Sequence, residues 1–133
     1  FHRSMDMGEN FETLSGDLTN GGKKGDVSYG TLTTISESPT RFGLIYVGSD
    51  DGLIHRSENA GESWTKITDN LPENFWVSTV VASAHKEGRV YTSLNGYRWD
   101  NFRPLVYVSE DYGNNWKDIS ANLPMEPVNV VKE

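Results

Sequence analysis

The sequence contains no cysteine, which excludes disulfide bonds and metal sites built from thiolates. No apolar run approaches the roughly 18 residues that a membrane-spanning helix needs. The three histidines, His2, His55 and His85, lie on different predicted segments without the spacing of metal ligands, so neither a metal nor a cofactor is expected. Basic residues are few: 12 Lys and Arg stand against 19 Asp and Glu, and the resulting net charge of −7 argues against nucleic acid as a partner.

What the sequence does contain is one short motif in three copies, which begin at Ser4, Ser57 and Ser109. Each copy has an acceptor side chain two residues after the serine, a glycine two residues later and an aromatic residue three positions beyond the glycine. The motif positions are Ser4, Asp6, Gly8 and Phe11; Ser57, Asn59, Gly61 and Trp64; and Ser109, Asp111, Gly113 and Trp116. A repeat of about fifty residues made of short strands is typical of a β-propeller with one blade per repeat.

The residue types in this motif indicate a structural role. The short acceptor side chain can bond backbone N–H groups of its own turn, and the glycine can adopt a positive φ without a Cβ clash. The aromatic residue begins a strand and can bury its face against a neighbouring blade. Asn59 replaces the aspartate of the other two copies, but its amide oxygen can still accept, so the same turn is expected there.

Between the motifs, the apolar pattern predicts an all-β chain: a β-propeller segment of four-stranded antiparallel blades, two complete and two partial. Residues 1–14 would end one blade, 15–68 and 69–120 would form two whole blades, and 121–133 would start the next. The expected strands are Thr31–Glu37, Leu44–Ser49, Leu53–Ser57 and Trp64–Thr68, then Val77–Ala84, Arg89–Leu94, Leu105–Ser109 and Trp116–Ser120, and finally Val128–Lys132.

A propeller closes with about four to eight blades, so this segment alone would leave strand edges and apolar blade faces exposed. We therefore expect the chain to be part of a larger protein whose remaining blades complete the ring. The alternative is self-association that completes it.

Two connections are longer than their counterparts in the other blade: 15–29, which precedes the first strand of the first whole blade, and 96–104, which joins the second and third strands of the second. Because strands in a blade alternate in direction, both should emerge on the face opposite the repeated turns. Long loops on a rigid scaffold often carry binding sites, and aromatic rings beside hydrogen-bonding groups suit a sugar or a peptide. The candidate ligand-binding residues are Tyr97, Arg98, Trp99 and Asp100, with Lys24 and Asp26 from the adjacent blade.

Each of these features also has a purely structural interpretation. Trp99 or Phe102 could fold down onto the blade, with Arg98 and Arg103 paired to carboxylates. The glycine-rich loop around Lys24 lacks the following helix of a phosphate-binding loop, which favours a flexible basic loop.

Glycoside hydrolysis needs two carboxyl groups roughly 5–10 Å apart. The candidates on the favoured face are Asp26, Asp50, Asp51 and Asp100, but Asp51-Gly52 between two strands is also the usual signal of a tight hairpin. The sequence does not show that any two of these carboxylates converge, so no catalytic residue is assigned.

The motif Ser-x-Asp-x-Gly-x-x-Trp resembles the Asp-box, or bacterial neuraminidase repeat, of sialidases, xyloglucan-type glycosidases and sortilin-like propellers. Residues 29–39, 44–52, 95–104 and 127–133 also resemble large bacterial sortilin-like propeller proteins that are often labelled glycosyl hydrolase. This resemblance implies a many-bladed propeller that is secreted, periplasmic or at the cell surface. It does not imply an activity, because one fold hosts many functions.

Two functions follow from these observations. In the first, which we favour, the chain is a non-catalytic propeller segment that serves as a scaffold for binding a protein, a peptide or a glycan. In the second it is part of a glycoside hydrolase of sialidase-like or xyloglucanase-like type. A sialidase would need several arginines around the substrate carboxylate, and Arg98 and Arg103 lie too close together in one loop to supply that cluster.

Overall fold

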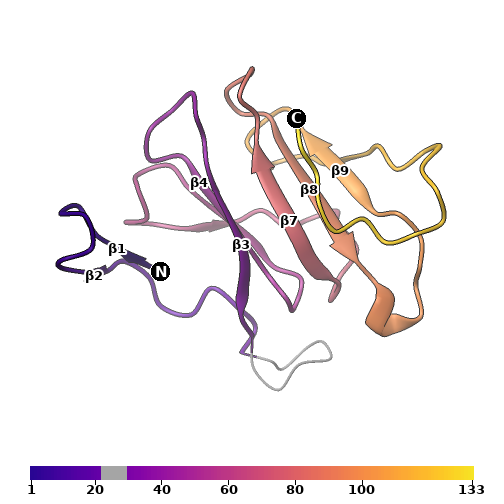
Figure 1. Cartoon of the computed structure of the whole chain (residues 1–133), viewed down its shortest axis with the longest axis horizontal. Helices are drawn as coiled ribbons and strands as arrows, with labels where there is room; N and C mark the ends of the chain where they lie inside the picture. The colour runs from indigo at the N-terminus through magenta and orange to yellow at the C-terminus, as the bar shows by residue number, and fades with distance from the viewer. Residues whose placement is uncertain (22–29) are drawn as a thin grey trace.

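The computed structural model describes residues 1–21 and 30–133, and it consists almost entirely of antiparallel β-sheet (Figure 1). Within these residues there is no α-helix and one short 3₁₀ turn, η1 (Tyr97–Trp99). The predicted all-β class with four-stranded antiparallel sheets is therefore confirmed. Lys24 and Asp26, two of the predicted ligand-binding residues, lie outside the described residues.

Two sheets of four strands follow one another along the chain, and each strand pairs with its sequence neighbour. The first contains β3 (Leu32–Glu37), β4 (Ile45–Ser49), β5 (Ile54–Ser57) and β6 (Thr65–Lys66). The second contains β7 (Trp76–Ala82), β8 (Val90–Asn95), β9 (Val106–Ser109) and β10 (Lys117–Asp118). A two-stranded hairpin of β1 (His2–Arg3) and β2 (Glu12–Thr13) precedes them.

The fourth strand of each sheet is shorter than predicted. Beyond β6, the Ile67 N–H still bonds the Ile54 carbonyl at 2.9 Å, but the Ile54 N–H donates to the Thr68 hydroxyl instead of to a backbone carbonyl. The Val106 N–H donates to the Ser120 hydroxyl in the same way. A side-chain oxygen thus replaces the next backbone acceptor, and this ends the regular ladder early.

The prediction of a strand at Val128–Lys132 is wrong. This segment is held mainly through side chains, because Ser78 Oγ donates to the Val128 carbonyl at 2.9 Å and Asn95 Nδ2 donates to Asn129 Oδ1 at 2.7 Å. Within the described residues no further strand lies beside it to form a ladder. Figure 1 shows this C-terminal segment, in yellow, passing over the second sheet.

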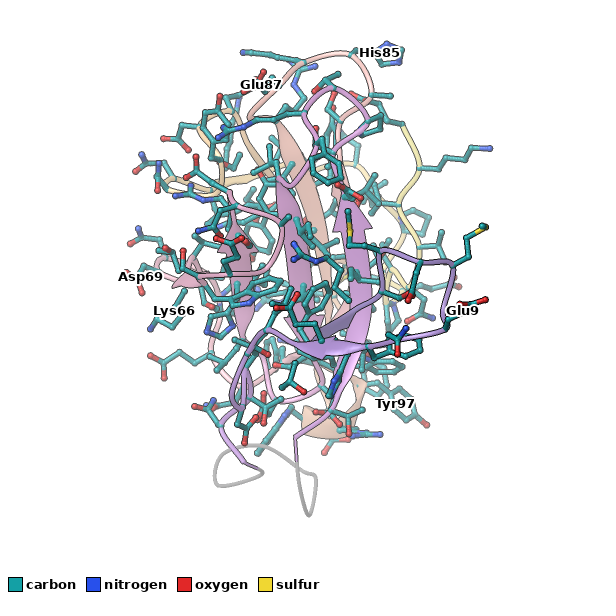
Figure 2. The ribbon with its side chains drawn as sticks, turned by 90° about the vertical axis from the view of Figure 1, so that its left-hand side faces the viewer. Glu9, Lys66, Asp69, His85, Glu87 and Tyr97 are labelled. Atoms are coloured by element: carbon teal, nitrogen blue, oxygen red, sulfur yellow. The ribbon has the colours of Figure 1, made fainter. Side chains whose placement is uncertain are left out.

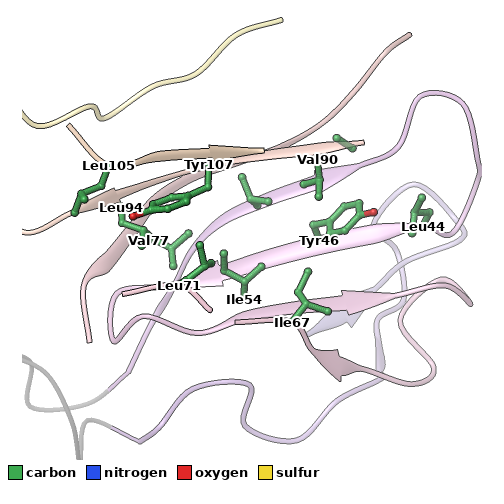
Figure 3. Close-up of a cluster of buried hydrophobic side chains, with 12 residues drawn as sticks. Leu44, Tyr46, Ile54, Ile67, Leu71, Val77, Val90, Leu94, Leu105 and Tyr107 are labelled. Atoms are coloured by element: carbon green, nitrogen blue, oxygen red, sulfur yellow. The ribbon is translucent and has the colours of Figure 1, made fainter. Parts of the chain in front are cut away.

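The core lies between the two sheets, where β7 packs against β3 and β4 (Figure 3). Tyr46, Val77 and Leu94 are among its fully buried side chains. A Cβ at Gly48 would lie 2.4 Å from Val77 Cγ1, so only glycine allows the sheets to approach this closely. Burial raises the pKa of the Tyr46 phenol, whose hydroxyl has no hydrogen-bond partner among the described residues.

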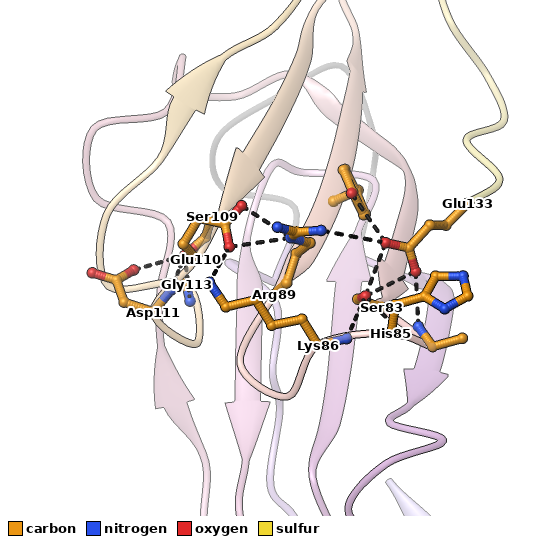
Figure 4. A network of polar contacts seen from close by, with 11 residues as sticks. Ser83, His85, Lys86, Arg89, Ser109, Glu110, Asp111, Gly113 and Glu133 are labelled. Atoms are coloured by element: carbon orange, nitrogen blue, oxygen red, sulfur yellow. Dashed lines mark hydrogen bonds and ion pairs between the residues drawn. The ribbon is translucent and has the colours of Figure 1, made fainter.

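A polar cluster fixes the end of the chain against the β7–β8 connection (Figure 4). The Glu133 carboxylate accepts from Ser83 Oγ at 2.8 Å and from the Ala84 N–H at 2.8 Å. Nearby, Arg89 pairs with Glu110 at 2.9 Å. The ion pair is partly exposed and contributes little stability, so the cluster mainly positions the C-terminal segment on the second sheet.

Candidate functional site

The three repeated turns connect β1 to β2, β5 to β6 and β9 to β10, and they share one hydrogen-bond pattern. In the third copy, Ser109 Oγ accepts from the Gly113 N–H at 2.8 Å and donates to Asp111 Oδ1 at 2.7 Å. Asp111 Oδ1 also accepts from the Asn115 N–H at 2.9 Å. The acceptors of the turn are therefore occupied by the turn itself.

The first copy has the same contacts and shows their electrostatic consequence. Hydrogen bonds from the Asn10 backbone and side chain, followed by that from Ser4, lower the pKa of Asp6 to about 2. Hydrogen bonds from the side chains of Asn115 and Ser109 likewise lower the pKa of Asp111. Neither carboxyl group is suited to proton transfer near neutral pH, because both stay charged.

The second copy forms the same turn although its acceptor residue is uncharged. Asn59 Oδ1 accepts from the Ser63 N–H at 2.9 Å and from Ser57 Oγ at 3.0 Å. Its amide nitrogen donates to Ser63 Oγ at 2.9 Å. The asparagine oxygen thus takes the position of a carboxylate oxygen in this turn.

The aromatic residues that follow the turns differ in burial. Trp116 is half-buried against the core, and its Nε1 donates to the Ile67 carbonyl at 2.7 Å. Trp64 is also half-buried and packs edge-on against Phe1, with ring centroids 5.2 Å apart. Phe11 is 68% exposed. Each tryptophan therefore packs toward the repeat that precedes it.

Arginines link successive turns in a way that the sequence analysis missed. Arg3 donates to the Ala60 carbonyl at 3.0 Å, and Arg56 donates to the Tyr112 carbonyl at 2.8 Å. Both carbonyls belong to left-handed residues directly before the turn glycine. The His-Arg pair that precedes both the first and the second motif serine could have indicated these contacts. In the third repeat, Val108 takes the place of the arginine.

The predicted binding loop lies at the opposite end of the second sheet from the third turn. The Tyr112 hydroxyl of that turn donates to Glu87 Oε1 at 3.0 Å, and Figure 2 shows Tyr97 far from Glu87, which lies on the β7–β8 connection. Tyr97 is 63% exposed and Trp99 is about half exposed. The structure thus brings Tyr97, Arg98, Trp99 and Asp100 together on one exposed turn.

This turn is held in place by contacts that were not predicted from the sequence. Asn95 Oδ1 accepts from the Tyr97 N–H at 2.8 Å, and Trp99 Nε1 donates to the Asn74 carbonyl at 3.2 Å. The Arg98 guanidinium lies over the Trp76 ring, 5.7 Å from its centroid. Nothing in the sequence pattern identifies Asn74 or Asn95, because their roles depend on contacts between segments far apart in the chain.

The two bulky side chains that could have covered the blade do not do so. Trp99 and Phe102 both remain about half exposed, and Phe102 packs edge-on against Tyr97 with centroids 5.5 Å apart. Within the described residues, neither Arg98 nor Arg103 forms an ion pair. Asp100 ends η1 in the left-handed conformation, with φ 53°.

Asp50 and Asp51 occupy a tight hairpin between β4 and β5. Asp51 is buried, and its carboxylate accepts from Ser49 Oγ at 2.5 Å and from the Asn20 N–H at 2.6 Å. Asp50 Oδ1 accepts from the Thr31 N–H at 2.7 Å. Both carboxylates therefore stabilise local structure.

Two hollows lie beside the β4–β5 and β8–β9 connections, at equivalent positions in the two repeats. The first, of about 300 Å³, is lined by Asp51 and Lys66 among others. The second, of about 400 Å³, has Arg103 and Asp118 at the corresponding positions. The signs of the two charges are exchanged between the hollows, so the same architecture presents different chemistry in each repeat.

Comparisons with known proteins agree with this geometry. The family described as BNR-Asp box repeat matches residues 106–119, which contain β9, the third turn and β10. The chain carries Asp-box repeats. The three turns at residues 4–11, 57–64 and 109–116 are called the first, second and third Asp-box turns below.

Two curated relatives are xyloglucanases. That of Hypocrea jecorina (strain QM6a) is 30% identical over 95 residues, 66% of this chain and 11% of the relative. That of Paenibacillus sp is 27% identical over 112 residues, 84% of this chain and 10% of the relative. The chain therefore spans about a tenth of the length of these relatives.

The similar solved structures have low sequence identity. An ancestral GH74 enzyme has a TM-score of 0.65 at 18% identity, covering 89% of this chain and 15% of that one. YCF48 bound to D1 peptide has a TM-score of 0.55 at 18% identity, covering 84% of this chain and 31% of that one. These similarities establish the fold: the chain is a β-propeller segment related to the propellers of glycoside hydrolases. No helix among the described residues is long and apolar enough to cross a membrane.

Proposed function

We propose that this chain is a non-catalytic segment of a larger, extracytoplasmic propeller, and that it binds a peptide, protein or glycan through the β8–β9 loop. The observation that carries this proposal is the exposed aromatic turn at Tyr97 and Trp99, held in place by Asn95 and Asn74. Exposed aromatic rings held in a fixed geometry lose little conformational freedom on binding.

Three further features support this role. Tyr97 and Phe102 form one continuous aromatic pair, and Arg98 and Asp100 flank it with polar groups of both signs. The loop lies away from the Asp-box turns, so a ligand there would not disturb them. The similar propeller YCF48 has been solved with a bound peptide, and this supports a peptide as one class of ligand.

The experiment is a screen followed by a titration. Arrays of glycans, including xyloglucan oligosaccharides, and of extended peptides would be probed with the chain, and the tightest binder would then be titrated against Tyr97→Ala/Trp99→Ala. We expect the affinity to fall at least about tenfold, because aromatic residues dominate the binding energy of such sites. If the variant keeps its fold and its affinity is unchanged, the loop does not bind the ligand.

A second candidate function is membership in a glycoside hydrolase, sialidase-like or xyloglucanase-like, and the xyloglucanase relatives favour it. Against it, Asp50 and Asp51 are engaged in a hairpin. A panel of chromogenic glycosides on the longer parent protein tests this candidate. Hydrolysis that is lost in Asp50→Asn or Asp100→Asn, with folding retained, would favour the enzyme over the scaffold.

A further inference from the structure

The arginines of the chain differ in whether a carboxylate of the chain balances their charge. Four of them form ion pairs with glutamates: Arg3 with Glu12, Arg41 and Arg56 with Glu58, and Arg89 with Glu110. Arg98 and Arg103, both on the β8–β9 loop, form none within the described residues, although the chain has 19 Asp and Glu. With Asp100 as its one acidic residue, the loop is positively charged on a chain of net charge −7.

Arg98 is the better placed of these two arginines to receive an external carboxylate. Its guanidinium lies over the Trp76 ring, 5.7 Å from the centroid. Stacking on an indole covers one face of the planar guanidinium and leaves the N–H donors at its edge available. Arg98 is exposed, so these donors are open to a ligand. A side chain that is already held in place also loses less freedom when it binds.

The residues that hold this part of the loop lie where the two sheets join. Trp76 is the first residue of β7, and Asn74, whose carbonyl accepts from Trp99 Nε1 at 3.2 Å, lies on the β6–β7 connection. Both four-stranded sheets that this connection links are among the described residues. The surface around Arg98 is therefore built entirely from parts of the two whole blades.

Exposed aromatic rings lie on different sides of Arg98. A 3₁₀ turn has three residues per turn, so the successive side chains of η1 point in three directions. Trp99 turns toward the Asn74 carbonyl, whereas Tyr97 turns toward the Phe102 ring. A carboxylate on Arg98 would thus have an aromatic ring on either side. This arrangement suits an acidic side chain within an extended peptide better than a carboxylate at the end of a chain.

The shape of the aromatic surface favours a peptide over a sugar chain. The rings of Tyr97 and Phe102 stand at 82° to each other, in an edge-on pair. Successive sugar rings stack on aromatic faces that lie in one plane, and this pair has no common plane. The corner that it forms can instead receive a single apolar side chain.

We propose that the ligand of the β8–β9 loop is an extended peptide with an Asp or Glu side chain between apolar residues. The carboxylate accepts two parallel hydrogen bonds from the Arg98 guanidinium, and the apolar neighbours contact Tyr97 and Trp99. The excess of carboxylates elsewhere on the chain works against highly acidic ligands, so a single carboxylate fits best. This inference rests on ligand binding by the β8–β9 loop, and it adds the chemistry of the ligand and the residue that recognises it.

Two matched peptide libraries test the role of the carboxylate. Both consist of short peptides with acetylated and amidated ends and random apolar residues, and they differ only in a central Glu or a central Gln. Each is titrated against the longer parent protein. We expect the Glu library to bind at least about fivefold more tightly, because a bidentate pair shielded by aromatic rings is stronger than an ordinary exposed ion pair. Added salt should reduce this preference.

Variants of the two unpaired arginines assign the preference to one residue. Arg98→Gln should abolish it, and Arg98→Lys should retain only part of it, because lysine keeps the charge without the paired donors. Arg103→Gln is the matched control, since Arg103 is also exposed and on the same loop. This variant should keep the preference for Glu. Thermal melts of all three variants check that the fold is retained.

The outcomes separate this inference from the proposed function. Equal binding of the two libraries, lost in Tyr97→Ala/Trp99→Ala, would overturn the carboxylate but leave the loop as a binding site. A preference for Glu that survives Arg98→Gln would overturn the role of Arg98. Tighter binding of Gln peptides with a free C-terminus, or of an oligogalacturonate, would overturn the acidic side chain as the ligand. If neither library binds, the inference is wrong, and the glycan arrays decide whether the loop binds at all.

Discussion

The two ends of the sheets differ in how closely they repeat. The three Asp-box turns reproduce the same serine and acceptor contacts, even where asparagine replaces aspartate. At the other end, the β4–β5 connection is a tight hairpin, whereas the β8–β9 connection is a long loop that exposes Tyr97 and Trp99. Uniform geometry at one end indicates a shared structural role, and variation at the other end indicates where repeats acquire separate functions.

The largest expected effect is on stability at the Asp-box end. Trp116→Ala removes a half-buried indole and its hydrogen bond to the Ile67 carbonyl, so the free energy of unfolding should fall by about 3 kcal/mol. Phe11→Ala, at the equivalent but exposed position, should change it little. Chemical denaturation of both variants measures the difference. Equal losses would contradict the difference in burial between Trp116 and Phe11.

A smaller loss is expected from the acceptor of the same turn. Asp111→Ala leaves the Asn115 N–H and the Ser109 hydroxyl without their partner, which should reduce the free energy of unfolding by about 1–2 kcal/mol. Asp111→Asn should retain most of the stability, because Asn59 supports the same turn in the second repeat. The melting temperatures of the two variants should therefore separate clearly; coincident values would argue against the oxygen acceptor as the cause.

The smallest expected effect is a pH dependence. The pKa of Asp6 is about 2 in the folded chain and that of Asp111 is also lowered, whereas an unfolded aspartate has a pKa of about 3.9. The stabilisation from these groups is therefore fully present above the unfolded pKa and is lost as the pH falls toward the folded pKa.

Asn59→Asp adds a third carboxylate to the series and should steepen this acid-induced loss, while Asp111→Asn should make it shallower. Thermal melts between about pH 2 and pH 6, on either side of the unfolded pKa, measure both slopes. Identical slopes in all three chains would show that the Asp-box carboxylates do not control the acid response.

The Asp-box turns were largely predictable from the sequence, because their hydrogen bonds join residues close together in the chain. Ser109, Asp111 and Gly113 lie within five residues, so their spacing alone indicates the turn. The arginine contacts were not predictable, since Arg56 meets Tyr112 only after two sheets have packed together.

The position of the candidate site was predictable from the sequence, but the contacts that hold its side chains in place were not. The extra length of the β8–β9 connection and its aromatic content identified Tyr97 and Trp99. Their anchoring by Asn95 and Asn74 depends on side-chain geometry and on a backbone carbonyl from another segment. The predicted strand at Val128–Lys132 failed for a related reason: an apolar pattern forms a strand only where a partner strand is present.

The most direct test of the account is to measure binding and folding side by side in variants of the two ends. Tyr97→Ala/Trp99→Ala and Asp111→Ala would each be titrated with the glycan or peptide selected from the arrays and melted under the same conditions. We predict that the loop variant loses affinity at least about tenfold and keeps its melting temperature, whereas Asp111→Ala melts earlier and binds normally per folded molecule. The opposite pattern, with binding lost in Asp111→Ala and stability lost in the loop variant, would contradict the separation of the two ends.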